Sequence, residues 1–101
     1  MRHRIVWREP ASADLDAIYD WIADGADPEI ALRFVTRIEA ACERLADFPL
    51  SGRSRNDIGP GLRSIPFART VTVFYTADEE TVSIVRVVHA RRDTAAAFEG
   101  D

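Results

Sequence analysis

The feature that most constrains the fold is the contrast between the two halves of the chain. The first half has apolar residues spaced three and four apart, whereas the second half has runs rich in β-branched residues. The first spacing places apolar side chains along one side of an α-helix, and alternation in the runs places them on one face of a strand. Helices and most strands are therefore separated along the chain. This order predicts an α+β fold, β–α–α–β–β–β, with a helical hairpin packed on a small, mostly antiparallel sheet.

The N-terminal segment predicts a strand followed by a helix. The strand covers residues 5–7, and we expect Pro10 to end it. Ser12 is the expected N-cap of the helix, and Gly25 is its expected C-terminal stop. The apolar stripe of this helix comprises Leu15, Ile18, Tyr19 and Ile22, with Trp21 at its edge.

A second helix is expected to begin at Asp27-Pro28, as N-cap and first helical residue, and to end near Asp47. The short connection between the two helices favours an antiparallel hairpin. The stripe of the second helix comprises Ala31, Phe34, Val35, Ile38, Ala41, Cys42 and Leu45. Cys42 is the single cysteine, so it forms no internal disulfide, and its place in the stripe predicts a buried, inert thiol.

Three strands are expected after a loop at 49–60, at residues 62–65, 70–76 and 81–89. In the second of these, Val71, Val73 and Tyr75 should share one face. In the third, strict alternation places Val82, Ile84, Arg86 and Val88 on one face and Ser83, Val85, Val87 and His89 on the other. Both faces are apolar, so we expect the helices to cover one, and a partner or the chain's own tail to cover the other.

The length of 101 residues suits a single domain. We divide it into a strand and helical hairpin at 3–48, a loop at 49–60, a three-stranded part at 61–90, and a tail at 91–101 with a frayed helical turn at 94–98. No apolar stretch approaches the roughly 20 residues that span a bilayer, and the N-terminus lacks an apolar signal region. A cytoplasmic protein without a membrane partner is expected.

The charge is uneven along the chain. The net charge is −4, yet residues 51–69 contain four arginines and one acid. An acidic protein of this kind does not match a general DNA-binding protein, which is usually basic overall. All 13 basic residues are arginines, whose planar guanidinium groups bind phosphates and carboxylates with two hydrogen bonds.

Few enzyme motifs are present. The chain has no Gly-rich phosphate loop and no His/Cys cluster at metal-binding spacing, so neither a cofactor nor a metal is expected. His89 ends a predicted strand, and Asp93 follows four residues later; a histidine there can be a catalyst or an interface residue. Arg86 is expected to pair with Glu43 or Asp47 of the second helix. The Arg91-Arg92 pair suits a solvated terminus as well as a binding site.

Four groups of residues, in this order, carry a resemblance to a known family. They are Phe48-Pro49-x-x-Gly52-Arg53, Gly61-Leu62-Arg63, Val73-Phe74-Tyr75, and Ile84-x-Arg86-Val87-Val88-His89-x-Arg91-Arg92-Asp93. Together they resemble the ParE branch of the RelE/ParE toxin superfamily. The resemblance covers nearly the whole chain, because the predicted strand and helical hairpin of the first half also agree.

The resemblance implies the toxin of a type II toxin–antitoxin system. Such a toxin inhibits DNA gyrase by binding, without chemistry, and a cognate antitoxin, ParD-like or similar, neutralises it. Operator DNA is then contacted only through the antitoxin. The antitoxin-binding candidates are Arg53, Arg63, Tyr19 and Trp21, and the target-binding candidates are Arg69, His89, Arg91 and Arg92.

Two alternatives stay open. A toxin similar to the RelE branch would cleave mRNA on the ribosome, with Arg63, Arg86 and His89 as its catalytic set. The chain departs from that branch because it has no Lys and has Ala90 where a related group has Tyr after the His, although Tyr75 could replace that phenol. The second alternative is a non-toxic protein that binds its antitoxin and regulates its operon.

Overall fold

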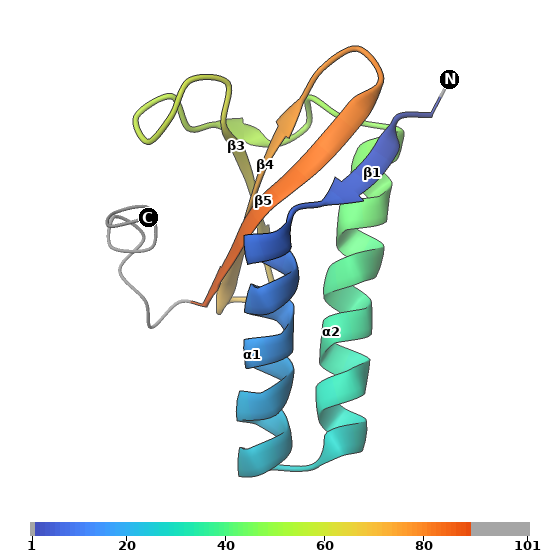
Figure 1. Cartoon of the computed structure of the whole chain (residues 1–101), viewed down its shortest axis with the longest axis vertical. Coiled ribbons are helices and arrows are strands. Elements are labelled where there is room, and N and C mark those ends of the chain that lie inside the picture. The colour runs from blue at the N-terminus through green and yellow to red at the C-terminus, as the bar shows by residue number, and fades with distance from the viewer. Residues whose placement is uncertain (1, 90–101) are drawn as a thin grey trace.

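Two helices lie against one face of a five-stranded sheet in the computed structural model, which describes residues 2–89 (Figure 1). The elements are β1 (Arg4–Trp7), α1 (Glu9–Gly25), α2 (Pro28–Glu43), a 3-10 turn (Arg44–Ala46), β2 (Arg53–Ser54), β3 (Arg63–Phe67), β4 (Val71–Ala77) and β5 (Thr81–His89). The strand order is β1-β5-β4-β3-β2, and only the β1–β5 pair is parallel. The predicted α+β fold is confirmed, with the short β2 as an addition.

The helix boundaries follow from capping. α2 begins as predicted, because the Asp27 carboxylate accepts hydrogen bonds from the backbone N–H groups of Glu29 (2.7 Å) and Ile30 (3.4 Å). The start of α1 was predicted wrongly. It begins at Glu9 with Pro10 in its first turn, where proline needs no hydrogen-bond partner for its nitrogen, so Ser12 is not the cap. The additional helical turn at the N-terminus brings α1 up to the end of β1.

The main core lies between the helices and the sheet. Its fully buried members include Ile38 of α2, Val73 and Tyr75 of β4, and Val82 and Ile84 of β5. The predicted face of β4 is confirmed, since Val71, Val73 and Tyr75 all belong to this core. Cys42 is also buried here, as predicted. Its pKa is raised to about 12, mainly by burial and to a smaller extent by the nearby Glu39 and Glu43 carboxylates.

A β-bulge in β5 changes which side chains face the helices. Phe74 pairs with Arg86 and Tyr75 pairs with Ile84, so Val85 is an extra residue opposite β4. Val87 therefore joins the main core, while Val88 packs with Phe74 on the other face. The prediction that Arg86 and Val88 continue the face of Val82 and Ile84 was wrong, because one extra residue reverses the alternation.

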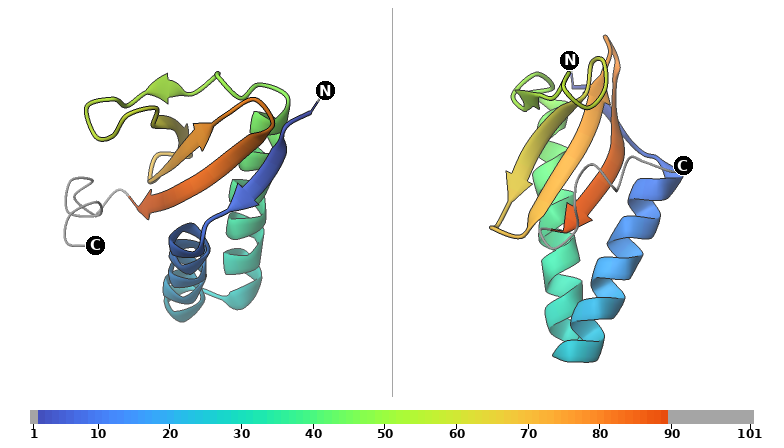
Figure 2. Two further views of the ribbon diagram at one scale, coloured as in Figure 1. Left: turned by 45° about the horizontal axis from the view of Figure 1, so that its top comes forward. Right: turned by 90° about the vertical axis from the view of Figure 1, so that its left-hand side faces the viewer.

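The loop between β2 and β3 covers part of the second face of the sheet. Leu62 and Ile58 from this loop pack with Phe74, Val85 and Val88 in a smaller core. The loop lies at the end of the molecule opposite the connection between α1 and α2 (Figure 2). The tail at 91–101, another expected cover, lies outside the described residues. Within residues 2–89, no helix is long and apolar enough to cross a membrane.

Candidate functional site

Arg86 is held by a carboxylate of α1. Its Nε and Nη2 atoms donate to the two oxygens of Asp14 at 2.8 Å and 3.0 Å, and the backbone N–H of Val87 donates to the same carboxylate at 2.9 Å. The side chains of Asp14 and Arg86 are only 10% and 13% exposed. This bidentate ion pair ties the bulge in β5 to the second turn of α1.

The predicted partners of Arg86, Glu43 and Asp47, were wrong. Helix α1, and not α2, lies against the bulged part of β5. Glu43 and Asp47 instead pair with the exposed Arg2 at 3.8 Å and 3.0 Å. Arg86 thus links β5 to α1 and belongs to the scaffold.

Arg63 holds the loop that precedes β2. Its Nη1 atom donates to the backbone carbonyls of Leu50 (3.2 Å) and Gly52 (2.8 Å). The backbone N–H of Gly52 donates to the hydroxyl of Tyr75 at 2.8 Å, and Tyr75 is the cross-strand neighbour of Arg63. A Cβ atom at residue 52 would lie 2.5 Å from that hydroxyl, so the close approach requires glycine. These contacts give the Gly52, Arg63 and Tyr75 positions of the sequence pattern a structural role.

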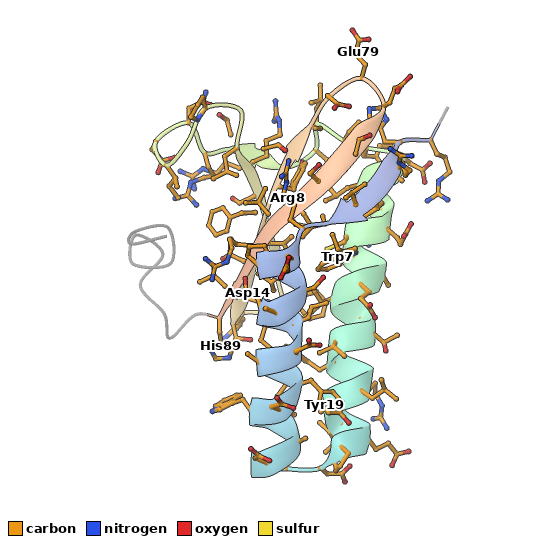
Figure 3. The ribbon with its side chains drawn as sticks, in the orientation of Figure 1. Trp7, Arg8, Asp14, Tyr19, Glu79 and His89 are labelled. Carbon is orange, nitrogen blue, oxygen red and sulfur yellow. The ribbon has the colours of Figure 1, made fainter. Side chains whose placement is uncertain are left out.

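His89 lies beside an exposed tryptophan. The bulge turns His89 toward α1, where its ring centroid is 5.1 Å from that of Trp21 (Figure 3). Trp21 is 57% exposed, and His89 is half-buried at the end of β5. Asp93, the expected orienting residue, lies outside the described residues.

The residues of a nuclease do not converge on a common reacting position. Arg86 binds Asp14, Arg63 binds loop carbonyls, and His89 packs against Trp21. Tyr75 is fully buried and accepts from Gly52, so its hydroxyl belongs to the core. In the part of the chain that the structure describes, no group of three or more His, Cys, Asp and Glu residues could hold a metal ion.

The other candidates are spread over the molecule. Arg53 is exposed on β2, and Arg69 is exposed in the turn between β3 and β4. Tyr19 is half-buried on α1, the helix that contacts β5 at the other side of the sheet. Arg91 and Arg92 lie outside the described residues. The antitoxin-binding candidates and the target-binding candidates therefore do not form two compact sites in residues 2–89.

The structure shows a groove that sequence reasoning missed. It has a volume of about 290 Å³ and lies between the end of α2 and β3, lined by Ala41, Arg44, Leu45, Phe48, Ser51, Ile65 and Pro66. Phe48 and Leu50, beside it, are 66% and 65% exposed. Strand β2 pairs only with Arg63 and Ser64, so among the described strands none covers the outer edge of β3 from residue 65 on. The apolar residues at 48–50, at the start of an otherwise polar loop, were the feature of the sequence that could have indicated this groove.

Comparison with known proteins places this geometry in a family. The model of the ParE toxin of the type II toxin–antitoxin system, parDE, matches residues 5–94. The chain is 33% identical over 93 residues to Toxin ParE3 of Caulobacter vibrioides, covering 92% of both chains. It is 33% identical to Toxin ParE1 of Mycobacterium tuberculosis, covering 92% of this chain and 95% of that one. It is also 34% identical to Toxin RelE2 of Caulobacter vibrioides, covering 88% and 97%.

Solved structures show the same fold. A chain of the chromosomal ParDE toxin–antitoxin system from P. aeruginosa superposes with a TM-score of 0.78 at 27% identity, covering 89% of this chain and 98% of that one. The toxin–antitoxin complex RelBE2 from Mycobacterium tuberculosis contains a chain that matches with a TM-score of 0.63 at 24% identity, covering 88% and 99%. The second likeness concerns the fold alone.

Proposed function

The chain belongs to the ParE toxin family of type II toxin–antitoxin systems, and on that premise we propose that it inhibits DNA gyrase by binding and that a cognate antitoxin neutralises it. The observation that carries the proposal is that Arg63 and Arg86, two residues of the possible nuclease set, are bound to other parts of the fold. The names of the ParE relatives favour the same reading.

Cleavage of RNA would require these arginines to act elsewhere. A nuclease needs a base, an acid and cations placed around one phosphate. If Arg86 moved to a phosphate, the largely buried Asp14 would be left without its partner, at a cost of about 3–5 kcal/mol. If Arg63 moved, the carbonyls of Leu50 and Gly52 would lose their donor. A rigid surface that binds a protein target requires neither movement.

The decisive experiment adds purified toxin to DNA gyrase and supercoiled plasmid. Trapped, cleaved DNA should accumulate as the toxin concentration rises, and addition of the antitoxin should reverse the effect. If supercoiling and cleavage stay unchanged at a large excess of toxin, the gyrase reading fails.

The relative named Toxin RelE2 keeps mRNA cleavage as the second candidate function. In a translating extract, that function predicts cuts in mRNA at the ribosomal A site, which His89→Ala abolishes. Intact mRNA excludes it. Normal growth during expression of the toxin alone, with neither effect, would leave a protein that only binds its antitoxin and regulates its operon.

The groove between α2 and β3 supplies a docking site for the antitoxin. Exposed Phe48 and Leu50 offer apolar contacts, and the edge of β3 beyond Ser64 offers backbone hydrogen bonds to an added strand. Arg44 lines the groove, and Arg53 is exposed nearby on β2, so an acidic segment with apolar residues complements the surface. Arg63 acts indirectly here, since it fixes the loop that carries Leu50.

Two serine variants test this docking site. Phe48→Ser should weaken antitoxin binding at least tenfold, because exposed aromatic anchors commonly contribute about 2 kcal/mol or more at an interface. Leu32→Ser is the matched control, because Leu32 is 58% exposed on α2 but does not line the groove. Equal antitoxin affinity for both variants, measured by calorimetry, would place the antitoxin elsewhere.

A further inference from the structure

Charge is divided between the two layers of the molecule. The five strands contain no Asp or Glu, and each of β1, β2, β3 and β5 contains an arginine. Helix α1, in contrast, contains five acidic residues and no basic one. The sheet is therefore locally positive, although the net charge of the whole chain is negative.

One part of the sheet presents this positive charge openly. The β1 patch, as we call it, comprises Arg4, Val6 and Arg8 at β1 with Thr81 and Ser83 of β5. Residues alternate between faces along a strand. Ile5 and Trp7 pack against the main core, so Arg4, Val6 and Arg8 face away from the helices. Figure 3 shows Trp7 directed toward the helices and Arg8 directed to the opposite side.

The neighbouring strand continues the patch with hydroxyl groups. Arg4 pairs with Thr81, and Val6 pairs with Ser83. Val82 and Ile84 lie in the main core, which places Thr81 and Ser83 on the outer face. Thr76 of β4 pairs with Ser83 on the same face. The outer face at β1 therefore combines two arginines with small hydroxyl side chains.

The two arginines are exposed and form no ion pair with any residue in 2–89. The arginines that do form ion pairs among the described residues are Arg2, Arg55 and Arg86. The acids near the patch stand at its ends. Asp78 accepts from the N–H groups of Glu80 and Thr81, which lower its pKa, with smaller effects of His3 and Arg4. Glu79 and Glu80 are exposed at the tip of the β4–β5 hairpin.

Arginine and hydroxyl side chains on a surface whose acidic residues stand at its ends are suited to the backbone of a nucleic acid. Proteins bind phosphates mainly through Arg, Lys, Ser and Thr, and such contacts carry no sequence preference. Arg4 begins β1, and Arg8 follows the strand in extended backbone as the N-cap residue of α1, so the two are separated by about 13 Å. That length spans several phosphates of one DNA strand.

We propose that the β1 patch contacts the phosphate backbone of the DNA that gyrase holds. This inference rests on the proposed function, because gyrase brings the DNA to the toxin. A chain with a net charge of −4 is not expected to retain free DNA, since long-range repulsion opposes the approach. Within a gyrase–DNA complex, the two arginines add contacts that favour the trapped state. The toxin thus touches both the protein and its DNA.

The test compares two double variants of the full chain in the gyrase cleavage assay. Arg4→Gln/Arg8→Gln removes both charges from the β1 patch, and Arg33→Gln/Arg37→Gln removes two exposed charges from α2 as a matched control. The patch variant should need about tenfold more toxin for half-maximal trapping. The slope of log affinity against log salt concentration should also decrease in magnitude by about two, one unit for each lost phosphate contact. The control should match the wild type in both.

Binding to gyrase without DNA, measured by surface plasmon resonance, identifies the partner of the patch. The patch variant should bind DNA-free gyrase as well as the wild type. Equal loss with and without DNA would show a protein contact and overturn the DNA assignment. The variant Glu79→Gln/Glu80→Gln should need less toxin than the wild type for half-maximal trapping, because it removes two negative charges beside the patch.

The failures of the two proposals are distinguishable. If the wild-type toxin traps cleavage complexes but the patch variant has the same potency and salt slope as the control, only the β1 patch inference is overturned. If the wild-type toxin itself traps nothing, the proposed function fails and the inference fails with it. Unchanged circular dichroism and antitoxin affinity establish that the patch variant is folded.

Discussion

The arginines whose side chains are held by contacts within the fold differ sharply from those that are exposed. Arg86 forms an ion pair with the Asp14 carboxylate of α1, and Arg63 donates hydrogen bonds to backbone carbonyls of the loop before β2. Arg4, Arg8 and Arg53 are exposed and have no ion pair among the described residues. The same side chain therefore stabilises the fold in one region and remains available to a partner in the other. Neighbouring elements, and not residue type, decide which role an arginine takes.

The largest effect is expected when the interior pair is broken. Asp14→Ala leaves the guanidinium of Arg86 and the N–H of Val87 without their acceptor in a largely buried site. The free energy of unfolding should fall by about 3–5 kcal/mol, measured by urea denaturation. Asp16→Ala, an exposed residue on the same helix, should change it by less than about 0.5 kcal/mol. Equal losses for both variants would contradict a structural role for the Asp14–Arg86 pair.

The loop contacts of Arg63 and Tyr75 can be tested through the glycine between them. Gly52→Ala places a methyl group against the Tyr75 hydroxyl and should destabilise the fold by about 1–3 kcal/mol. Gly59→Ala is the control, because a Cβ there meets nothing within 4 Å. Thermal denaturation measures both variants. A neutral Gly52→Ala would mean that the loop moves freely, so that Arg63 does not fix the groove.

The buried thiol predicts a pH dependence of stability. Because burial raises the pKa of Cys42 from 9.0 to about 12, the folded protein keeps its proton where the unfolded chain loses it. Unfolding releases a proton between pH 9 and 12, so the stability should decrease as pH rises through this range. The decrease is about 1.4 kcal/mol for each pH unit above the unfolded pKa. Cys42→Ala should lack this contribution, and parallel pH profiles for the two proteins would contradict it.

The smallest effects on stability are expected at the exposed arginines. Arg53→Ala and Arg69→Ala should each change the free energy of unfolding by less than about 0.5 kcal/mol, because neither side chain is buried or ion-paired among the described residues. Their effects should instead appear in binding: Arg53→Ala weakens the antitoxin complex, and Arg69→Ala weakens gyrase inhibition. A loss of more than about 1 kcal/mol in the free energy of unfolding would show that these two arginines stabilise the fold as Arg63 and Arg86 do, and would contradict the distinction between held and exposed arginines.

Local patterns accounted for most of the elements. The Asp27-Pro28 start of α2, the apolar stripes of both helices and the alternation in β4 depend on residues close together in the chain. Such patterns follow from the periods of helix and strand, which the sequence displays directly. The family pattern likewise joined short motifs in a fixed order, and the match over residues 5–94 agrees with it.

Local reasoning failed where a single residue departed from a regular period. The extra residue Val85 in β5 reverses the alternation for Arg86 to His89, and no residue in this β-branched run marks the position of a bulge. The error at the start of α1 was different. There Pro10 was interpreted as the end of the strand, although proline is also well suited to the first turn of a helix.

By itself, the sequence determined the order of the elements, the apolar faces of most of them, and the family. Only the tertiary structure decided which arginines are available to partners, which side of β5 carries His89, and where the groove and the β1 patch lie. The physical reason is separation along the chain: Asp14 and Arg86 are 72 residues apart, and Gly52 and Tyr75 are 23 apart. Contacts of this kind depend on how the layers pack, and no local period contains that information.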